Sequence, residues 1–222
     1  MRELVDGVFE LSLGFVNLHV VVTDDGVVLV DTGLPRRSAR IQKELLGIRK
    51  SIGEVRSILL THHHFDHTGN VADLRTRSGA RVFAHAADAP VISGAARPEA
   101  TGALVRMVSR VMSAQPTKID QVITGDGSEP LPGFTAVHTP GHTRGHVSYL
   151  LDRAGGVLFA GDDLGDLEAF EAVRALRDGG LPALLVCSGS EEQEALAELA
   201  DVVVDGPGGV LDLLDGFAAQ AG

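Results

Sequence analysis

The sequence of 222 residues has one cysteine, one tyrosine and no tryptophan. The single thiol, Cys187, excludes an intramolecular disulfide and also excludes a zinc site built from several thiolates. Any bound metal must therefore be held by histidine and carboxylate side chains, and the nine histidines make such a site plausible.

A long apolar run is also missing. Residues 26–30 and 202–204 are examples of the longest apolar stretches, and both fall far short of the ~20 residues that a membrane span needs. The charged N-terminus, with Arg2, Glu3 and Asp6, does not have the pattern of a signal peptide. We expect a soluble, cytoplasmic protein without a membrane partner.

Basic residues are scarce in the C-terminal part of the chain. Residues 1–160 carry 17 basic and 16 acidic side chains, whereas residues 161–222 carry 2 basic and 14 acidic ones. The formal net charge of −11 disfavours a nucleic-acid partner, because phosphate backbones are bound by clustered Lys and Arg. The step in charge favours two segments of different origin, and an acidic solvated face is the alternative explanation.

The hydrophobic content, the length and the residue pattern of the sequence indicate a folded α/β protein. The hydrophobic content of 44% and the length suit one large domain, or one domain with a small appendage. The pattern predicts an opening β-meander and a helix, with strands at residues 7–11, 18–22, 27–30 and 57–60 and the helix within residues 36–50.

The remaining elements are predicted in the same way. Helix 71–78 is followed by strand 81–84, an amphipathic helix at 104–112 that is more typical of core packing, and strands 135–139, 147–151 and 157–160. Residues 161–222 are predicted to alternate between helices and strands, an order typical of chains that form parallel sheets. The predicted elements are helix 166–177, strand 183–187, helix 190–200, strand 202–205 and helix 208–219.

One short run, residues 61–67, concentrates the chemistry. His62 and His64 are two residues apart, so on an extended backbone both rings face the same side, and Asp66 and His67 follow on the next bend. Such a set without thiolate suits Zn²⁺, and Fe or Mn are alternatives. A run of surface histidines is the plainer explanation, but this run follows an apolar strand and is interrupted by Asp66.

The pattern His62-x-His64-x-Asp66-His67, preceded by Asp31-Thr32-Gly33 at a strand end, resembles the signature of the metallo-β-lactamase superfamily. The resemblance continues through residues 138–146, with His142, and through residues 158–162, which end at Asp162. It covers roughly residues 3–163 and implies an αββα sandwich.

The resemblance also implies roles for individual residues. His62, His64 and His142 would hold a first metal, Asp66 and His67 would contribute to a second, and Asp162 would bridge both. Asp66 would also position the attacking water or assist proton transfer. Asp31 would orient the ligand loop from behind.

The other histidines are first given structural roles. His63 is expected to point away from its two neighbours, His146 to brace the loop after His142, and His19 and His138 to lie in strands. For His85, at a strand end, substrate contact and a plain structural role remain equally open.

The family pattern normally ends with a further histidine, and no histidine follows His146 here. The corresponding stretch, residues 203–209, offers Asp205 and Pro207 instead. We therefore expect one tightly bound zinc, with a second that is weak or absent unless Asp163 or Asp205 replaces the missing ligand.

The tail, residues 160–222, resembles the C-terminal part of haloacid-dehalogenase-type trehalose-phosphate phosphatases, a Rossmann-like βαβα segment. The acidic cluster Asp162, Asp163 and Asp166 would bind Mg²⁺ in that family, but the chain contains no Asp-x-Asp nucleophile motif. A recombined or designed chimera would explain both the tail and the charge step. We expect residues 161–222 to pack onto residues 1–160 as part of one domain.

The leading interpretation is a hydrolase in which a zinc-activated water attacks a small-molecule ester, thioester, lactone, lactam or phosphoester. One alternative is a metal-binding protein with little catalysis, because the second site is incomplete. The other is a Mg²⁺-dependent phosphatase acting through Asp162, Asp163 and Asp166.

Overall fold

A computed structural model describes residues 1–13, 16–97, 114–160, 186–189 and 202–205. The chain opens with an antiparallel meander of four strands, β1 (Arg2–Val5), β2 (Val8–Ser12), β3 (Asn17–Thr23) and β4 (Gly26–Val30). The tight connection between β3 and β4 pairs Thr23 with Gly26, as the Asp-Asp-Gly turn predicts.

The sheet then changes from antiparallel to parallel pairing. Strands β5 (Val55–Leu59), β6 (Arg81–His85) and β7 (Gln121–Ile123) are added in order to β4, which completes a seven-stranded sheet ordered β1 to β7. Parallel strands need crossover connections, and helices supply them. These are α1 (Ser38–Gly47), the 3₁₀ turn η1 (Ile52–Glu54), α2 (Phe65–Thr68), α3 (Val71–Ser78) and, after β6, α4 (Ala89–Ile92).

A second sheet is antiparallel and has the order β11-β10-β9-β8. Its strands are β8 (Ser128–Leu131), β9 (Phe134–His138), β10 (Val147–Leu151) and β11 (Val157–Phe159). A separate parallel pair joins β12 (Val186–Gly189) to β13 (Val202–Asp205).

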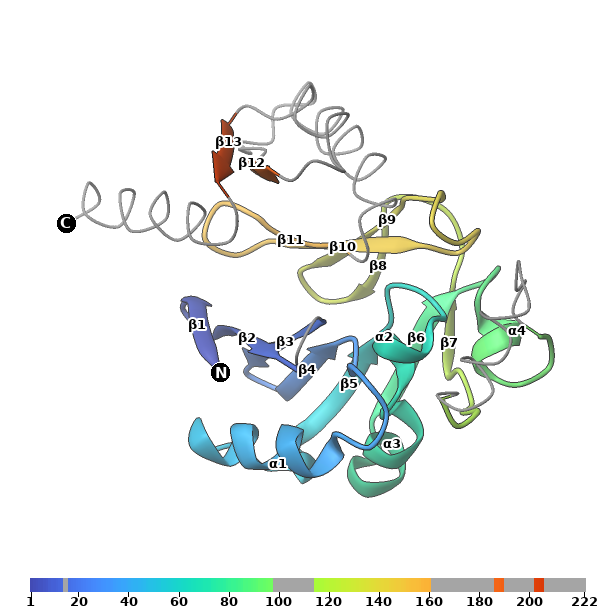
Figure 1. Ribbon diagram of the computed structural model, residues 1–222, viewed down its shortest axis with the longest axis horizontal. Helices are drawn as coiled ribbons and strands as arrows, with labels where there is room; N and C mark the ends of the chain where they lie inside the picture. The colour runs from blue at the N-terminus through green and yellow to red at the C-terminus, as the bar shows by residue number, and fades with distance from the viewer. Residues whose placement is uncertain (14–15, 98–113, 161–185, 190–201, 206–222) are drawn as a thin grey trace.

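Two apolar cores explain the layering. On β4 the side chains of Val27 and Leu29 belong to the core under the helices, whereas Val28 and Val30 belong to the core between the two sheets. Alternate residues of a strand point to opposite faces, so a central strand buried on both sides needs a continuous apolar run. The result is a stack of helices, the seven-stranded sheet and the four-stranded sheet (Figure 1).

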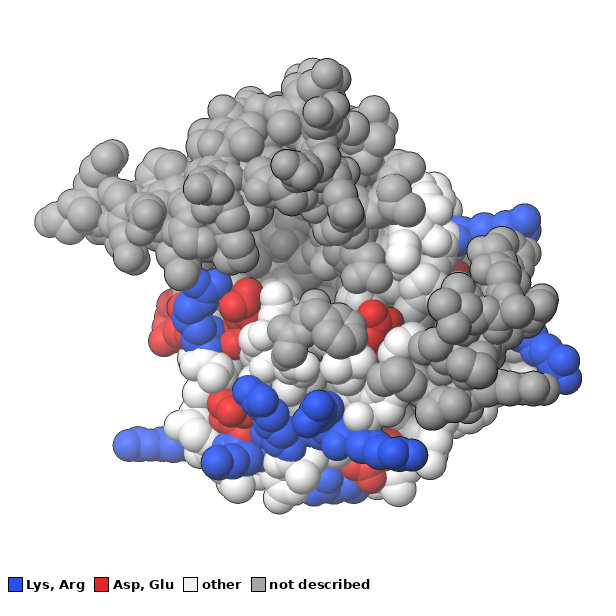
Figure 2. Space-filling model, viewed as in Figure 1, with Lys and Arg blue, Asp and Glu red and all other residues white. Residues whose placement is uncertain are grey.

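The helices cover the outer face of the large sheet with one apolar stripe each. Ile41 and Leu45 are the buried residues of α1, and Val71 and Leu74 are those of α3. The spacing of three or four residues places each pair on one side of its helix. Lys and Arg gather over the opposite, solvated side of this layer (Figure 2).

Most of the predicted elements are confirmed, with ends that shift by a residue or two. The short strands β7 and β8 and the short helices α2 and α4 were not predicted, because three or four residues carry too little periodicity to be recognised. The parallel pairing of strand 202–205 with a strand that includes residues 186 and 187 is also confirmed.

Several predictions lie outside the described residues. These are the helices at 104–112, 166–177, 190–200 and 208–219, and therefore the fourth layer of the expected αββα sandwich. Of residues 161–222 only the β12–β13 pair is described, so the packing of the tail onto residues 1–160 stays a prediction. Within the described part of the chain, no helix has the length and apolar character to span a membrane.

Candidate metal centre

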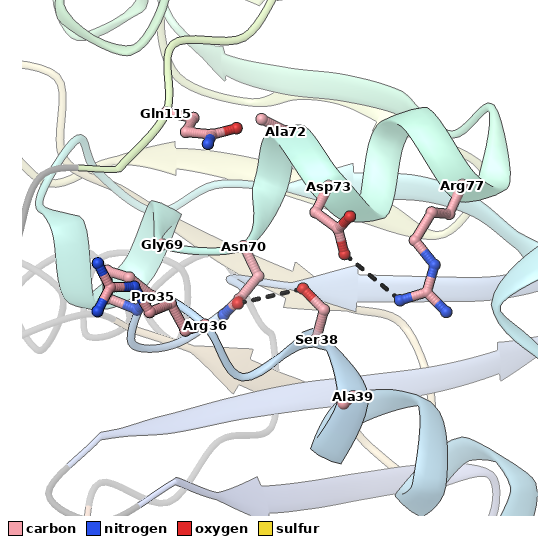
Figure 3. A pocket seen from close by; sticks show the side chains of 10 residues that line it. All are labelled: Pro35, Arg36, Ser38, Ala39, Gly69, Asn70, Ala72, Asp73, Arg77 and Gln115. Atoms are coloured by element: carbon pink, nitrogen blue, oxygen red, sulfur yellow. Dashed lines mark hydrogen bonds and ion pairs between the residues drawn. The ribbon is translucent and has the colours of Figure 1, made fainter.

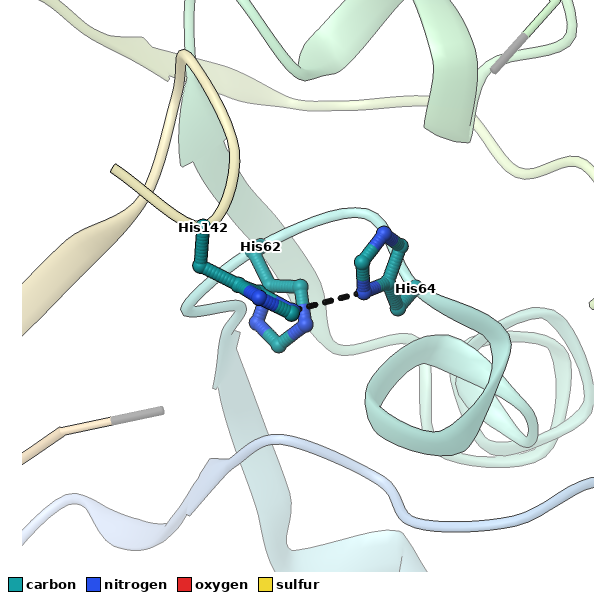
Figure 4. A group of neighbouring side chains, drawn as sticks. All are labelled: His62, His64 and His142. Atoms are coloured by element: carbon teal, nitrogen blue, oxygen red, sulfur yellow. Dashed lines mark hydrogen bonds between the residues drawn. The ribbon is translucent and has the colours of Figure 1, made fainter. Parts of the chain in front are cut away.

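Three histidines from two separate loops meet at one edge of the sandwich. His62 and His64 lie between β5 and α2, and His142 lies between β9 and β10. One ring nitrogen from each lies within 4.8 Å of the other two, and the rings stand edge-to-face with centroids 4.5–4.8 Å apart (Figure 4). The two loops are brought together because Val147 N donates to Thr61 O at 2.9 Å, which joins the start of β10 to the end of β5.

A chain of hydrogen bonds from Asp31 through Thr61 sets the orientation of the His62 ring. Thr61 Oγ1 donates to Asp31 Oδ2 at 2.8 Å, so the same hydroxyl can only accept from His62 Nδ1, which lies 3.0 Å away. This places the proton of His62 on Nδ1 and the lone pair on Nε2. A lone pair on a fixed nitrogen is what a metal ligand requires.

Asp31 holds a second ring of the run in the same way. Its Oδ2 lies 2.8 Å from His67 Nδ1, and its Oδ1 accepts from Thr61 N at 2.8 Å. Asp31 is buried and adopts a left-handed φ of 64°, a conformation that costs energy for most residues other than glycine. The resemblance implied that Asp31 orients the ligand loop, and these contacts are consistent with that role.

The loop that follows Asp31 is also tied to the histidine run. Thr32 donates to His67 O from both its backbone nitrogen (2.7 Å) and its hydroxyl (2.9 Å). Gly69 crosses so close to this loop that a Cβ atom would lie 2.3 Å from Pro35 N. Asn70, buried, bridges the two segments with hydrogen bonds from Nδ2 to Thr32 O and Leu34 O at 2.6 Å.

Beside Asn70 the molecule has a hollow of about 500 Å³ on its outer side (Figure 3). The side chain of Asn70 accepts from Ser38, and Asp73 pairs with Arg77 one turn along α3. Among the described residues no histidine lines this hollow, which lies between the start of α1 and α3, so it is not part of the histidine cluster.

The three clustered histidines pass a chemical test as metal ligands. His142 Nε2 and His64 Nδ1 lie 2.8 Å apart, close enough to share a proton. Zn–N bonds of 2.0–2.1 Å in a tetrahedral site place ligand nitrogens roughly 3.3 Å apart. The observed separations, from 2.8 Å for one pair up to 4.8 Å, span that value. An all-imidazole set also matches the preference of zinc and related ions.

His146 is fully buried against the same cluster. Its ring lies 5.4 Å from that of His62, and its Nδ1 lies 2.7 Å from Thr139 Oγ1. Burial lowers the pKa of His146 to about 4, so the ring is neutral at physiological pH. The backbone oxygen of His146 accepts from Thr139 N at 3.0 Å, which closes the loop as the sequence predicted.

His63 turns away from the cluster and toward Asp88. Its Nδ1 lies 3.0 Å from Asp88 Oδ2, and its backbone nitrogen donates to the same oxygen at 3.0 Å. Burial on its own raises the pKa of Asp88, but hydrogen bonds from His63, Thr143 and Gly145 lower it overall. His63 is therefore outside the ligand cluster, in line with the prediction.

The remaining histidines make contacts within the scaffold. His19 packs against Phe159 with centroids 5.1 Å apart, and burial lowers its pKa. His85 stacks on His138 with centroids 4.1 Å apart, and its Nδ1 accepts from Ala87 N at 3.3 Å. Burial first, and then the neighbouring His138, lower the pKa of His85.

The other predicted ligands lie outside the three-nitrogen group or outside the described residues. His67 is buried with its ring 4.2 Å from that of His62, and Asp66 is half-buried in the first turn of α2. Neither belongs to the three-nitrogen group. Asp162 lies outside the described residues, so its predicted bridging role stays a prediction.

Sequence reasoning missed the supporting roles of polar residues in and beside the ligand loops, namely Thr61, Asp88, Thr139 and Thr143. A usable signal existed for Asp88, because Asp31 and His85 also lie at strand ends and Asp88 comes three residues after β6. For the threonines no such signal exists, because a hydroxyl in a loop is common.

Comparison with known proteins agrees with this geometry. The family model for the metallo-β-lactamase superfamily matches residues 11–185, which is more than half of the chain. The chain belongs to the metallo-β-lactamase superfamily. The match reaches beyond residue 163, where the sequence analysis ended the resemblance, and so includes part of the tail that was compared with haloacid dehalogenases.

Individual members of the superfamily are similar over part of their length. The "Probable metallo-hydrolase YflN" of Bacillus subtilis (strain 168) is 31% identical over 72% of this chain and 65% of that protein. The hydroxyacylglutathione hydrolase of Cereibacter sphaeroides is 37% identical over 64% of this chain and 51% of that protein.

Among solved structures, the class B3 di-zinc metallo-β-lactamase LRA-12 from an Alaskan soil metagenome has a TM-score of 0.55 and 25% identity, over 65% of this chain and 55% of that one. The chain thus spans between half and two thirds of the length of these superfamily members. The first two are named as hydrolases and the third as a β-lactamase.

Proposed function

We propose that the chain is a zinc-dependent hydrolase of small acyl compounds, that is, of esters, thioesters, lactones or lactams. The observation that carries the proposal is the convergence of His62, His64 and His142, whose ring nitrogens lie within 4.8 Å of one another at the edge of the sandwich. The di-zinc β-lactamase and the hydroxyacylglutathione hydrolase support zinc as the metal and an acyl compound as the substrate.

The residues present fit a metal ion. His62, His64 and His142 would hold it, and a zinc ion bound by three imidazoles supplies Lewis acidity, which lowers the pKa of water and polarises a carbonyl group. Thr61 and Asp31 keep the proton of His62 on Nδ1, so that this ligand does not have to lose a proton when metal binds.

The carboxylate of Asp66 is proposed to accept a proton from the attacking water. The oxygen of that water forms the new bond to the acyl carbon, and the proton passes to the oxygen, sulfur or nitrogen that leaves, so that the acid and the second product are formed. Asp66 is half-buried beside His67, where a carboxylate is reachable by a small substrate.

A second metal would be bound by Asp66, His67 and Asp162. His67 supports this because Asp31 holds its Nδ1, which puts the lone pair on Nε2. Strand β11 runs antiparallel to β10, so its carboxyl end at Phe159 approaches the edge where β10 begins after His146. We expect the second metal to bind weakly, because residues 203–209 offer Asp205 and Pro207 where the family pattern has a histidine.

The deciding experiment measures metal content and turnover on the same preparation. Purified chain is stripped with a chelator, reloaded with Zn²⁺, Fe²⁺ or Mn²⁺, and assayed against an ester, a thioester, a lactone and a β-lactam. We expect close to one tightly held zinc per chain and hydrolysis of at least one substrate that depends on it. A chain that retains no metal after dialysis would contradict the proposal.

The two alternatives give different results in this assay. A metal-binding protein without efficient catalysis would retain zinc and hydrolyse none of the panel. A Mg²⁺ phosphatase acting through Asp162, Asp163 and Asp166 would cleave a phosphomonoester with Mg²⁺ alone and would keep that activity in His62→Ala. The chimeric origin of the tail concerns residues 161–222 and would be supported by phosphatase activity of this kind.

A further inference from the structure

Asp88 is a buried carboxylate that lies between the two ligand-bearing loops. It follows β6 by three residues, at the same edge of the sandwich as the histidine cluster, and its residue exposure is 3%. A buried aspartate is costly unless its oxygens are hydrogen-bonded, so the identity of its partners matters.

The partners of Asp88 come from both ligand loops. Oδ2 accepts from the backbone nitrogen of His63 at 3.0 Å and from the hydroxyl of Thr143 at 2.8 Å, and Oδ1 accepts from Gly145 N at 2.9 Å. His63 stands between the ligands His62 and His64, and Thr143 directly follows the ligand His142. One carboxylate therefore joins the backbone of the first ligand pair to the loop of the third ligand.

The contact with the second loop is close. A Cβ atom added at Gly145 would lie 2.6 Å from Asp88 Oδ1 and 2.7 Å from Asp88 N. Such a separation is far below a normal contact, so the loop can approach Asp88 only because residue 145 has no side chain. The sequence Gly-His-Thr-Arg-Gly at 141–145 thus brings a ligand, a hydroxyl donor and a close backbone approach within five residues.

We propose that Asp88 is a positioning residue that sets the separation between the His62–His64 loop and the His142 loop, and thereby the zinc affinity. This inference rests on the proposed function, because it assigns Asp88 to the same metal centre. Asp88 acts through the backbone on either side of the ligands and through Thr143, and it touches none of the three ligand nitrogens.

The test compares Asp88, which follows the carboxyl end of β6, with Asp120, which is bonded to the start of the same strand. Asp120 accepts from Val82 N at the start of β6 and from Arg75, so it is a multiply bonded carboxylate that lies away from the ligand loops. Zinc affinity of the full chain, stripped of metal, is measured by competition with a chromophoric chelator, and Tm is measured in the metal-free state.

We expect Asp88→Ala to raise the Kd for zinc by about 10–100-fold, the range seen when outer partners of metal ligands are removed. Asp88→Asn should show a smaller increase, because an amide keeps one acceptor but turns its NH₂ group toward a donor. Asp120→Asn should lower Tm and leave the Kd for zinc within about twofold. Unchanged zinc affinity in both Asp88 variants, or an equal loss in Asp120→Asn, would overturn the proposal.

A more conservative variant tests the same proposal if Asp88→Ala fails to fold. Thr143→Val removes only the hydroxyl that donates to Asp88 and should raise the Kd for zinc by about 3–10-fold, the equivalent of one hydrogen bond. Thr143→Ser should restore affinity. Thr76→Val, which removes an exposed hydroxyl bonded to Ala72 O in α3, is the matched control and should leave the Kd unchanged.

Zinc affinity does not depend on turnover, so the two proposals fail separately. A parent chain that binds zinc and hydrolyses no acyl compound contradicts the proposed function, while the Kd ratio between Asp88→Ala and the parent still decides the role of Asp88. Equal zinc Kd values for Thr143→Val, Thr143→Ser and the parent would count against Asp88 even if the chain proves to be an active hydrolase.

Discussion

The two edges of the β-sandwich differ in how their polar groups are used. At the carboxyl ends of β5 and β6, buried carboxylates and hydroxyls bond to the ligand loops and to the rings of His62 and His67. At the opposite edge, a larger cavity of about 1070 Å³ is lined by charged residues such as Asp24, Arg56 and Arg153. Neither this hollow nor the smaller one beside Asn70 is lined by the three clustered histidines.

The reason lies in what each side chain bonds. Arg56 and Arg153 donate to backbone carbonyls, for example to Asp25 O at 3.4 Å and Val22 O at 3.1 Å, so they cap the ends of strands. At the histidine edge, the carboxylates fix backbone and ring nitrogens of the same few residues. Convergence of ligand atoms with a buried supporting network is therefore a better guide to this site than cavity volume.

The largest expected effect is the loss of the centre itself. His62→Ala should weaken zinc binding by more than ~100-fold, beyond the effect of removing an outer partner, and abolish hydrolysis, because two imidazoles remain where three converge. His63→Ala is the control, since His63 faces Asp88, and should change the Kd for zinc by less than about tenfold. Metal analysis after dialysis measures both, and equal losses would refute the ligand assignment.

Removing the support behind the ligands should have the next largest effect. Asp31→Ala leaves Thr61 N, the Thr61 hydroxyl and His67 Nδ1 without their shared acceptor, and each buried polar group left unsatisfied costs about 1–3 kcal/mol. We expect a loss of more than ~3 kcal/mol in unfolding free energy. Urea denaturation of the metal-free chain measures it, with Asp31→Asn, which tolerates the left-handed φ, expected to lose less.

A single hydrogen bond between the sheets should have a smaller effect. Tyr149 is fully buried, burial raises the pKa of its hydroxyl, and that hydroxyl donates to Leu60 O at 2.8 Å beside the ligand loop. Tyr149→Phe should cost about 1–2 kcal/mol of unfolding free energy. Urea denaturation checks this value, and a destabilisation above ~3 kcal/mol would show that the hydroxyl supports more than one contact.

The opposite end of β6 gives a test by pH. The hydrogen bond from Arg75 is the main reason why the pKa of Asp120 is lowered to about 2 from its ordinary value of 3.8. A depressed folded-state pKa contributes stability above the unfolded pKa, and this stability is lost as the pH falls from about 4 to about 2. Urea midpoints of metal-free protein should fall less steeply over that range in Asp120→Asn than in the parent chain.

The smallest effect is expected for the cap at the far edge. Arg153→Ala removes the hydrogen bonds to Asp6 O and Val22 O, both of them at least partly exposed, and should cost no more than ~1 kcal/mol. The Kd for zinc should stay within about twofold. A larger shift in zinc affinity would mean that the two edges are coupled through the sheets.

The sequence by itself determined the local features. Short runs rich in apolar residues predicted β3, β4, β9 and β10, and the run from His62 to His67 marked the ligand loop directly. The third ligand, His142, came from resemblance to a family, since nothing in local spacing links it to a loop 78 residues earlier.

Only the tertiary structure decided which polar residues support the ligands. Asp88 and Thr143 are 55 residues apart, and Asp31 and His67 are 36 apart. They meet because the carboxyl ends of parallel strands β4, β5 and β6 share one edge, and because β10 attaches to that edge through Thr61. Hydrogen-bond partners of this kind depend on strand order and sheet packing, which are properties of the whole fold and are not written in any single segment.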